Sequence, residues 1–344
     1  MLAALIVPKF LKENRIFKAN ARDNALNRFK LLREELKEKG ISLATEDIHP
    51  LGKAQLHIHH DINQTSLRES NKSNAAKILI VSESPIICPE NHDSELRKSF
   101  HRILSWESNN HEKNTYWLGC GCSFTQEITQ PQIYDRTRSE ELCMIAGNKR
   151  SKDPNELYST RDKAIDHFSN STVDFSLFGV GWDQRQFQNI FRPLNRVRKA
   201  RTIWHRPPKD FKGAISNKHE ILRDFRFSLA FENAKTNNGY ITEKLFDSMF
   251  SGCIPIYIGA SDITDFVPEN TFINANAYYK NGMSSLERMI QSIDETELQM
   301  MRGAILSFTH EFKKTTYFDA TWAKSVAEHC IQTIQQTRQA STSQ

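Results

Sequence analysis

The segment from Phe225 to Ile258 constrains the fold more than any other part of the chain. It opens with FRFSLAF, in which large apolar side chains alternate with smaller or polar ones, as expected of a β-strand with one strongly buried face. It closes with the apolar run IPIYI, which predicts a second buried strand at 254–258. Between them, Thr242 is a good N-cap for a short helix that ends near Gly252. The segment therefore predicts a β-loop-α-β unit of a parallel sheet.

Polar residues in this unit lie where a ligand is expected. In an open parallel sheet, ligands bind outside the carboxyl ends of the strands. The loop after the first strand and the first helical turn fall on that side, and they hold Glu232, Asn233, Tyr240, Glu243 and Lys244.

The two charges in the first helical turn have different interpretations. Glu243 compensates the partial positive charge at the helix N-terminus, so helix stabilisation explains it as well as ligand binding does. Lys244 is unfavourable there, and an anion held by Lys244 and the free backbone N–H groups would reverse that cost. For Lys244, phosphate binding and extension into solvent remain open alternatives.

The run FxLAFENxxxxxGYITEKLxDxxxxGxIPIYIG in this segment resembles the donor-binding signature of the α1,3/4-fucosyltransferases. The resemblance implies an α/β fold of GT-B type, with two Rossmann-like domains facing a cleft, and GDP-fucose as the donor. It also implies that Glu243 binds the guanosine ribose and Lys244 the diphosphate. Tyr240 and Asn233 are implied to line the nucleotide-sugar pocket, and Glu232 to touch the fucose.

A second match lies at KILIVSESP, residues 77–85. The apolar run at 78–81 has the length of a strand, and SESP breaks it into a turn. On its own, an acid at a strand end is usually a solvated loop residue. The segment resembles the Glu-Ser-Pro stretch of the family's first domain, whose Glu is the proposed catalytic base, so the resemblance implies that Glu83 is the general base.

Two further candidates rest on weaker matches. The stretch DFSLFGVGWDQR, residues 174–185, predicts a strand that runs into a loop with two glycines. It resembles a Gly-x-Gly segment that some family members follow with a diphosphate-binding Arg, and Arg185 is the nearest equivalent. Lys218 stands where many members have a Lys shortly before the signature strand, and it is a secondary candidate for the donor site.

Fucosyl transfer explains why these residue types are needed. Loss of GDP builds positive charge on the sugar and negative charge on the departing phosphate, which Lys244, the helix N-terminus and Arg185 would stabilise. Other glycosyltransferases use a divalent ion held by an Asp-x-Asp motif, and the sequence contains none. We therefore expect a metal-independent enzyme that requires no cofactor. With Glu83 taking the acceptor proton, the resemblance implies inversion, so that β-linked GDP-fucose gives an α-fucoside.

Length and composition favour a globular protein of two domains. The chain has 344 residues, of which 38% are hydrophobic and 25% charged. No apolar run approaches the roughly 20 residues that cross a bilayer, and 1–7 lacks the features of a secretory signal. We therefore expect a cytoplasmic location, either free or peripheral on the inner membrane. The scattered cysteines agree with a reducing compartment.

The net charge of +5 is modest and spread along the chain, so it does not indicate nucleic-acid binding. The basic stretch at 192–212 is compatible with contact to nucleotide phosphates, an anionic membrane or an acidic glycan, and equally with a solvated basic face. The cluster LHIHHDI places His57, His59 and Asp61 on one strand face. A strand near the acceptor side explains it better than a metal site does, and no metal ligands are predicted.

The chain order predicts four parts. Residues 1–135 form an acceptor-side α/β domain with the base, 136–318 the GDP-fucose-binding Rossmann-like domain, 319–339 a C-terminal helix, and 340–344 a disordered tail. The first domain opens with a βαβ unit whose helix, expected at 23–39, stops at Gly40.

The acceptor is the largest unknown. The family's usual acceptor is an N-acetylglucosamine, at O3, within a lipopolysaccharide or a Lewis-type glycan. The alternatives are transfer from another GDP-sugar and a non-catalytic relative that binds a nucleotide sugar or glycan.

Overall fold

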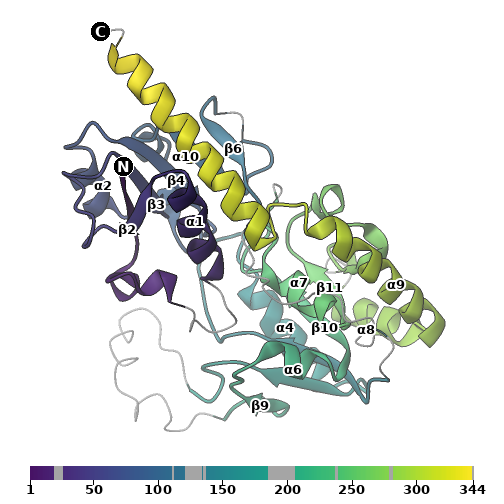
Figure 1. The fold of residues 1–344 in the computed structure, drawn as a ribbon. Helices are drawn as coiled ribbons and strands as arrows, with labels where there is room; N and C mark the ends of the chain where they lie inside the picture. The colour runs from purple at the N-terminus through teal and green to yellow at the C-terminus, as the bar shows by residue number, and fades with distance from the viewer. Residues whose placement is uncertain are drawn as a thin grey trace. The chain divides into compact units, whose positions relative to one another are not determined.

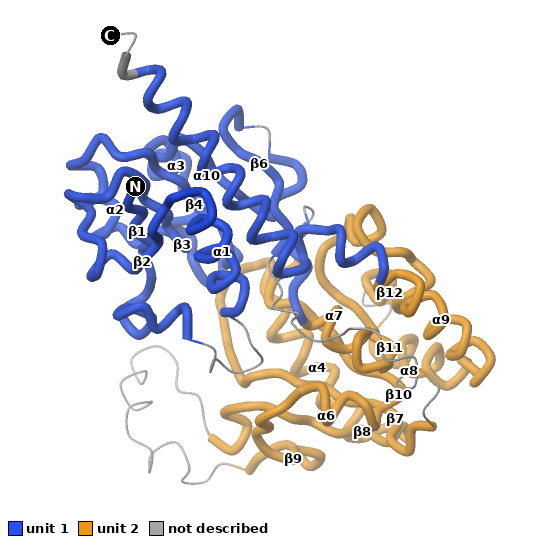
Figure 2. Tube along the Cα trace, in the orientation of Figure 1, with its two compact units in different colours: residues 1–126, 238–243, 310–344 blue, residues 127–237, 244–309 orange. Residues whose placement is uncertain are grey.

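The structure is a computed structural model in which the following residues are described: 1–18, 26–110, 112–120, 134, 137–184, 206–236, 239–278 and 282–342. The chain forms two compact units (Figure 2). The first unit comprises 1–126, 238–243 and 310–344, and the second comprises 127–237 and 244–309. Each unit is built on a six-stranded parallel sheet, so the predicted α/β fold with two Rossmann-like sheets is confirmed.

The units differ in detail from the predicted domain limits. The contacts of 238–243 and 310–318 group these residues with the first unit, although both stretches fall within the predicted second domain. Most of the basic stretch at 192–212 lies outside the described residues. Among the described helices, none is long and apolar enough to cross a membrane.

The sheet of the first unit has the strand order β2-β1-β3-β4-β5-β6. Its strands are β1 (Leu2–Ile6), β2 (Ser42–Thr45), β3 (Leu56–His60), β4 (Ala76–Val81), β5 (Arg102–Ser105) and β6 (Thr115–Trp117). Its α-helices are α1 (Asn27–Glu38), α2 (Gln64–Ser70), α3 (Ser94–Arg97) and α10 (Asp319–Thr342), and its short 3-10 turns are η1 (Lys9–Leu11), η2 (Arg15–Phe17) and η4 (Pro89–His92).

Helix α1 forms where the sequence predicts an amphipathic helix. Phe29, Leu32 and Leu36 are fully buried on one face of the helix. Gly40 ends the helix as predicted: it has a left-handed φ of 74°, and the N–H groups of Gly40 and Ile41 donate to the carbonyls of the last turn. The expected start of this helix, Asp23, lies outside the described residues.

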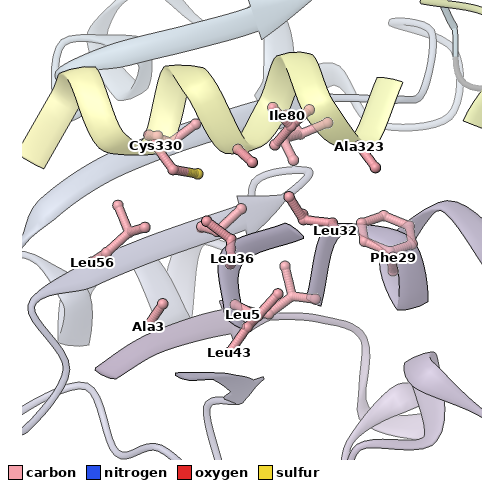
Figure 3. Close-up of a cluster of buried hydrophobic side chains, with 14 of the residues drawn as sticks. Ala3, Leu5, Phe29, Leu32, Leu36, Leu43, Leu56, Ile80, Ala323 and Cys330 are labelled. Atoms are coloured by element: carbon pink, nitrogen blue, oxygen red, sulfur yellow. The ribbon is translucent and has the colours of Figure 1, made fainter. Parts of the chain in front are cut away.

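Helix α10 completes the core of the first unit. It packs against α1, β4 and β5 (Figure 1). Figure 3 shows Ala323 and Cys330 of α10 facing side chains of α1 and the sheet in one apolar cluster. The helix begins at the predicted residue but continues to Thr342, so 340–342 are helical and the tail prediction is wrong for them. No Gly or Pro follows Asp319 that would end the helix earlier.

The sheet of the second unit has the strand order β12-β11-β10-β7-β8-β9. Its strands are β7 (Glu140–Ile145), β8 (Phe175–Phe178), β9 (Phe211–Gly213), β10 (Phe225–Phe231), β11 (Ile254–Ile258) and β12 (Ile273–Asn274). Its α-helices are α4 (Tyr158–Phe168), α6 (Lys218–Leu222), α7 (Glu243–Phe250), α8 (Met283–Ser292) and α9 (Glu295–Phe312), of which α9 ends within the first unit, and its 3-10 turns are η7 (Ile263–Asp265) and η8 (Glu269–Thr271).

Strands β10 and β11 have the predicted bounds, but β10 is buried differently from the prediction. Ser228 and Ala230, expected on a less buried face, are only 4% and 3% exposed. The Ser228 hydroxyl contacts the hydroxyl of Ser248 on α7 at 2.6 Å. A central strand of a parallel sheet is covered on both faces, so alternation in its sequence does not mean one-sided burial.

Candidate active site

The strand order of the second unit defines where a ligand would bind. Strands β7 and β10 are neighbours, but the chain leaves them in opposite directions, toward β8 and β11 respectively. Open α/β sheets bind ligands outside the carboxyl ends of the two strands at such a switch point. The loop that follows β10 begins with Glu232 and Asn233, and the loop that follows β7 begins at Ala146.

Glu232 is fully buried at the end of β10. Its N–H donates to the carbonyl of Ile258 at 2.8 Å, which extends the pairing of β10 with β11. Its carboxylate lies 3.4 Å from the ammonium of Lys244, in the first turn of α7. Gly259 has no room for a side chain, because a Cβ there would lie 2.6 Å from both Glu232 Cγ and the Tyr257 ring. The glycine of the IPIYIG run is therefore needed for the close packing around Glu232.

The Glu232 contact argues against one of the two interpretations of Lys244, and phosphate binding stays a prediction. The Lys244 side chain is only 20% exposed and turns toward the buried carboxylate, so extension into solvent is wrong. Glu232 compensates the unfavourable placement of a cation at a helix N-terminus. The pair holds a cation beside the start of α7.

Asn233 is fixed by a residue that the sequence did not reveal. The guanidinium of Arg161, on α4, donates to Asn233 Oδ1 at 3.0 Å and to the carbonyl of Phe231 at 2.5 Å. Arg161 is buried, and the Asn233 carbonyl accepts from the N–H of Leu157. Nothing in the local pattern of α4 distinguishes this arginine from an ordinary exposed helix residue.

Helix α7 begins at Glu243, directly after Thr242, as the capping argument predicts. It ends in a Schellman motif, in which Gly252 has a φ of 72° and its N–H donates to the carbonyl of Met249. Lys218 makes an ion pair with Asp247 on α7, with 3.0 Å between Nζ and Oδ2. The structure thus joins Lys218 to the helix that carries Lys244.

The predicted glycine loop follows β8. Gly179 has a φ of 138°, and a Cβ there would overlap the carbonyl of Ala146, so only glycine fits. The N–H of Asn148 donates to the Val180 carbonyl at 2.9 Å, and the indole of Trp182 donates to Ala146 at 2.7 Å. The loops after β7 and β8 are thereby joined. Arg185 lies outside the described residues.

A basic run after β7 was missed by the sequence reasoning. Lys149, Arg150 and Lys152 are exposed in the loop at the switch point. Arg150 pairs with Asp162 of α4 at 2.9 Å. The signal was available, because the letters NKRSK begin two residues after the apolar strand.

Tyr240 belongs to the stretch 238–243 that groups with the first unit. Its side chain is buried, and its ring centroid lies 4.9 Å from that of Trp106, which follows β5. Gly239 precedes it with a φ of 80°, and the N–H of Ile241 donates to the Gly239 carbonyl.

Glu83 lies in the turn after β4, half-buried. Asp61 fixes this turn: its Oδ1 accepts from the N–H groups of Ser82 and Glu83, at 2.8 and 3.2 Å, and from the Asn91 side chain at 2.6 Å. Ser84, the next residue, is fully buried. The carboxyl ends of β3 and β4 thus meet at the candidate base.

His57 and His59 do share a strand face, but they contact a hydroxyl. His57 Nδ1 lies 2.7 Å and His59 Nε2 3.2 Å from Oγ of Ser70 on α2. Burial, followed by the charge of neighbouring His57 and Lys77, lowers the pKa of His59 to about 3, so the ring is neutral. Among the residues that the structure describes, no three His, Cys, Asp or Glu side chains are grouped to hold a metal ion.

Comparison with known families assigns the chain to a family. The model of glycosyltransferase family 10 (fucosyltransferase), C-terminal part, matches residues 159–343, which is more than half of the chain. The chain belongs to glycosyltransferase family 10. The family resemblance of the signature segment is thereby confirmed.

Individual relatives match over short stretches. The chain is 42% identical over 60 residues to an α-(1,4)-fucosyltransferase of Arabidopsis thaliana, a match that covers 17% of this chain and 15% of the relative. It is 42% identical over 65 residues to the α-(1,3)-fucosyltransferase FucT of Helicobacter pylori, covering 19% of this chain and 13% of the relative. The matched segments thus span less than a sixth of these relatives.

Among solved structures, the crystal structure of an α1,3-fucosyltransferase with GDP-fucose matches 97% of this chain and 90% of that chain. The TM-score is 0.54 at 16% sequence identity. The similarity is one of fold, and it confirms the predicted GT-B class.

Proposed function

We propose that this protein transfers L-fucose from GDP-fucose to a hydroxyl of a glycan, with inversion at the anomeric carbon and without a metal ion. The observation that carries the proposal is the pairing of Lys244 with buried Glu232 at the switch point, within the family signature. An ammonium beside the first turn of α7 adds its charge to that of the free N–H groups of the helix, which suits a diphosphate.

The donor-site roles follow from this placement. Lys244 would hold the diphosphate and stabilise the charge that develops as GDP leaves. Glu243 would accept hydrogen bonds from the guanosine ribose, while Asn233 and Tyr240 would line the nucleotide-sugar pocket. Glu232, which turns toward Lys244, would contact the fucose in the same site.

Lys218 and Arg185 are two further candidates for the donor site, and we propose a different role for each. We propose that Lys218 acts on the position of α7, because its ammonium is paired with Asp247. Arg185 is proposed as a second diphosphate ligand on the strength of the sequence match alone. Lys149 is exposed in the loop that follows β7, on the carboxyl side of this sheet.

Glu83 is proposed as the general base that takes the proton of the attacking hydroxyl. The support is its half-buried place at the carboxyl end of β4, with its backbone N–H held by Asp61. Attack from the face opposite to the leaving GDP gives the α-fucoside. Since Lys244 and the helix start supply positive charge at the diphosphate, the reaction needs no divalent ion.

We propose O3 of N-acetylglucosamine in a lipopolysaccharide or Lewis-type glycan as the acceptor. The matched relatives include both α1,3- and α1,4-fucosyltransferases. The linkage is therefore a question for product analysis.

The test is incubation of the full chain with GDP-fucose, EDTA and a panel of N-acetylglucosamine-containing acceptors, followed by mass spectrometry and linkage analysis. A gain of one deoxyhexose in the presence of EDTA is the expected result. Parallel reactions with GDP-mannose test the alternative donor. Donor binding is checked separately, as a Lys244-dependent rise in melting temperature with GDP-fucose.

The outcomes separate the parts of the proposal. Protection by GDP-fucose without any product would keep the donor and exclude the tested acceptors. Product that disappears with EDTA and returns with a divalent ion would contradict the metal-independent mechanism. Absence of both product and protection would overturn the assignment of GDP-fucose.

A further inference from the structure

A series of buried polar side chains in the first unit ends at the main chain of Glu83. We propose that His92, held by Glu107, is a positioning residue that fixes the main chain of Glu83 and through it the direction of its carboxylate. The inference rests on the proposed function, because it takes Glu83 as the general base.

His92 lies between two hydrogen-bond acceptors. Its Nδ1 is 3.2 Å from Glu107 Oε1, and its Nε2 is 3.3 Å from the carbonyl oxygen of Glu83. A carboxylate and a carbonyl only accept, so both bonds form together only when both ring nitrogens carry hydrogen. The side chains of His92 and Glu107 are 15% and 13% exposed, and the ring packs against Trp106 with 5.7 Å between centroids. His92 is therefore held in place on both edges of its ring.

Glu107 is itself fixed as a charged acceptor. Its second oxygen accepts from Arg97 Nη1 at 2.9 Å, Ser105 Oγ at 2.8 Å and Asn110 Nδ2 at 3.2 Å. Burial raises the pKa of Glu107, but the hydrogen bond from His92 and the charge of Arg97 outweigh it and bring the pKa to about 2. The carboxylate remains ionised at any pH at which the enzyme would work, so His92 always faces a negative charge.

Both peptide groups that flank the Cα of Glu83 are thus held. Asp61 accepts from its N–H at 3.2 Å, and Nε2 of His92 lies 3.3 Å from its carbonyl oxygen. Fixing these two groups sets the direction of the Cα–Cβ bond and therefore where the carboxylate can reach. A general base has to lie within hydrogen-bond distance of the proton that it removes. A displacement of about 1 Å at a reacting group can lower the rate on the order of 100-fold.

The test compares two substitutions of His92 in the full chain. His92→Phe keeps the ring packing and removes both N–H groups, and kcat is expected to fall roughly 10- to 100-fold with little change in KM for GDP-fucose. His92→Gln keeps an N–H donor and should recover part of the lost kcat. His101→Phe is the control: His101 is an exposed histidine of the same unit that accepts from the N–H of Lys77, and its substitution should leave kcat within about threefold. Melting temperatures show whether each variant is folded.

A double-mutant cycle decides whether His92 acts through Glu83. If it does, His92→Phe lowers the residual rate of a Glu83→Gln enzyme by less than about threefold, although it lowers the wild-type rate much more. An equal loss in both backgrounds would overturn the positioning role and leave the base assignment intact. A Glu83→Gln enzyme with the full wild-type rate would instead show that Glu83 is not the general base, and would overturn the proposed mechanism. A His92→Phe enzyme that is folded and fully active would overturn the inference alone.

Discussion

The two sheets each present an acid at the carboxyl end of a strand, and the two acids are held in different ways. Glu232 in the second unit is fully buried, and its side chain faces Lys244. Glu83 in the first unit is half-buried, and Asp61 and His92 hold its main chain. A buried carboxylate suits the fixed placement of a cation, whereas a partly exposed one on a rigid turn suits proton transfer to an incoming group. We therefore propose different chemistry for the same residue type in the two units.

The largest effect on activity is expected from Glu83→Gln. Loss of a general base lowers kcat by roughly 10²- to 10⁴-fold, whereas the contacts of Asp61 and His92 to the main chain do not use the substituted carboxylate and should persist in a folded variant. Steady-state fucosyl transfer and chemical denaturation measure the two effects. The exposed acid Glu95 provides the control, because Glu95→Gln should keep the wild-type rate.

Lys244→Ala tests the pair that Lys244 forms with Glu232, the acid of the second unit. Removal of an electrostatic ligand of the leaving group should lower kcat/KM by about 10²- to 10³-fold, and the variant should also be less stable because Glu232 is left buried without its cation. The double variant Glu232→Gln/Lys244→Ala should regain stability but not activity. Full activity of Lys244→Ala would contradict the role proposed for the Lys244–Glu232 pair, and with it the difference drawn between Glu232 and Glu83. Lys163→Ala, on the exposed side of α4, is the matched control.

Acid should loosen the first unit before the second. Burial lowers the pKa of His57 and His59, to about 3 for His59, whereas the unfolded chain binds these protons near pH 6.5. The stability that these neutral histidines contribute is therefore present above pH 6.5 and is lost as the pH falls from 6.5 toward 3. Between pH 7 and 5, amide protection factors in β3 and β4 should fall by roughly tenfold or more, and by less in β10.

Hydrogen exchange read out by mass spectrometry follows both sheets in one experiment. His59→Gln should flatten the pH dependence in β3 and β4. Equal loss of protection in the two sheets would show that the buried histidines do not set the acid sensitivity.

Arg161→Lys tests how the loop after β10 is held. A lysine cannot reproduce the two bonds that the guanidinium makes to Asn233 and Phe231. We expect KM for GDP-fucose to rise roughly tenfold, corresponding to about one charge-assisted hydrogen bond, with kcat changed less. An unchanged KM with lowered stability would assign Arg161 a purely structural role.

The smallest effect is expected from Lys218→Met. The ammonium of Lys218 pairs with Asp247 and reaches α7 through it, so the substitution should change KM for GDP-fucose by less than about threefold, the range of a partly exposed ion pair. A large rise in KM that Asp247→Asn does not reproduce would instead make Lys218 a direct ligand of the donor.

Much of the second unit could be predicted from local pattern. The bounds of β10 and β11, the start of α7 after Thr242 and its end at Gly252 follow from periodicity and capping, which depend on neighbouring residues only. The same reasoning was wrong about the exposure of Ser228 and about 340–342. In both cases the outcome depends on what packs against the segment or on how far a helix propagates.

By itself, the sequence determined the β-loop-α-β signature, the α/β class and the membership in a fucosyltransferase family, because each depends on residues that are close together along the chain. Only the tertiary structure decided that β7 lies beside β10, that Lys244 turns inward to Glu232, and that Asp61 holds the turn of Glu83. These contacts join residues from different strands and helices. The order of the strands in the sheet determines which of these residues meet, and no local periodicity specifies that order.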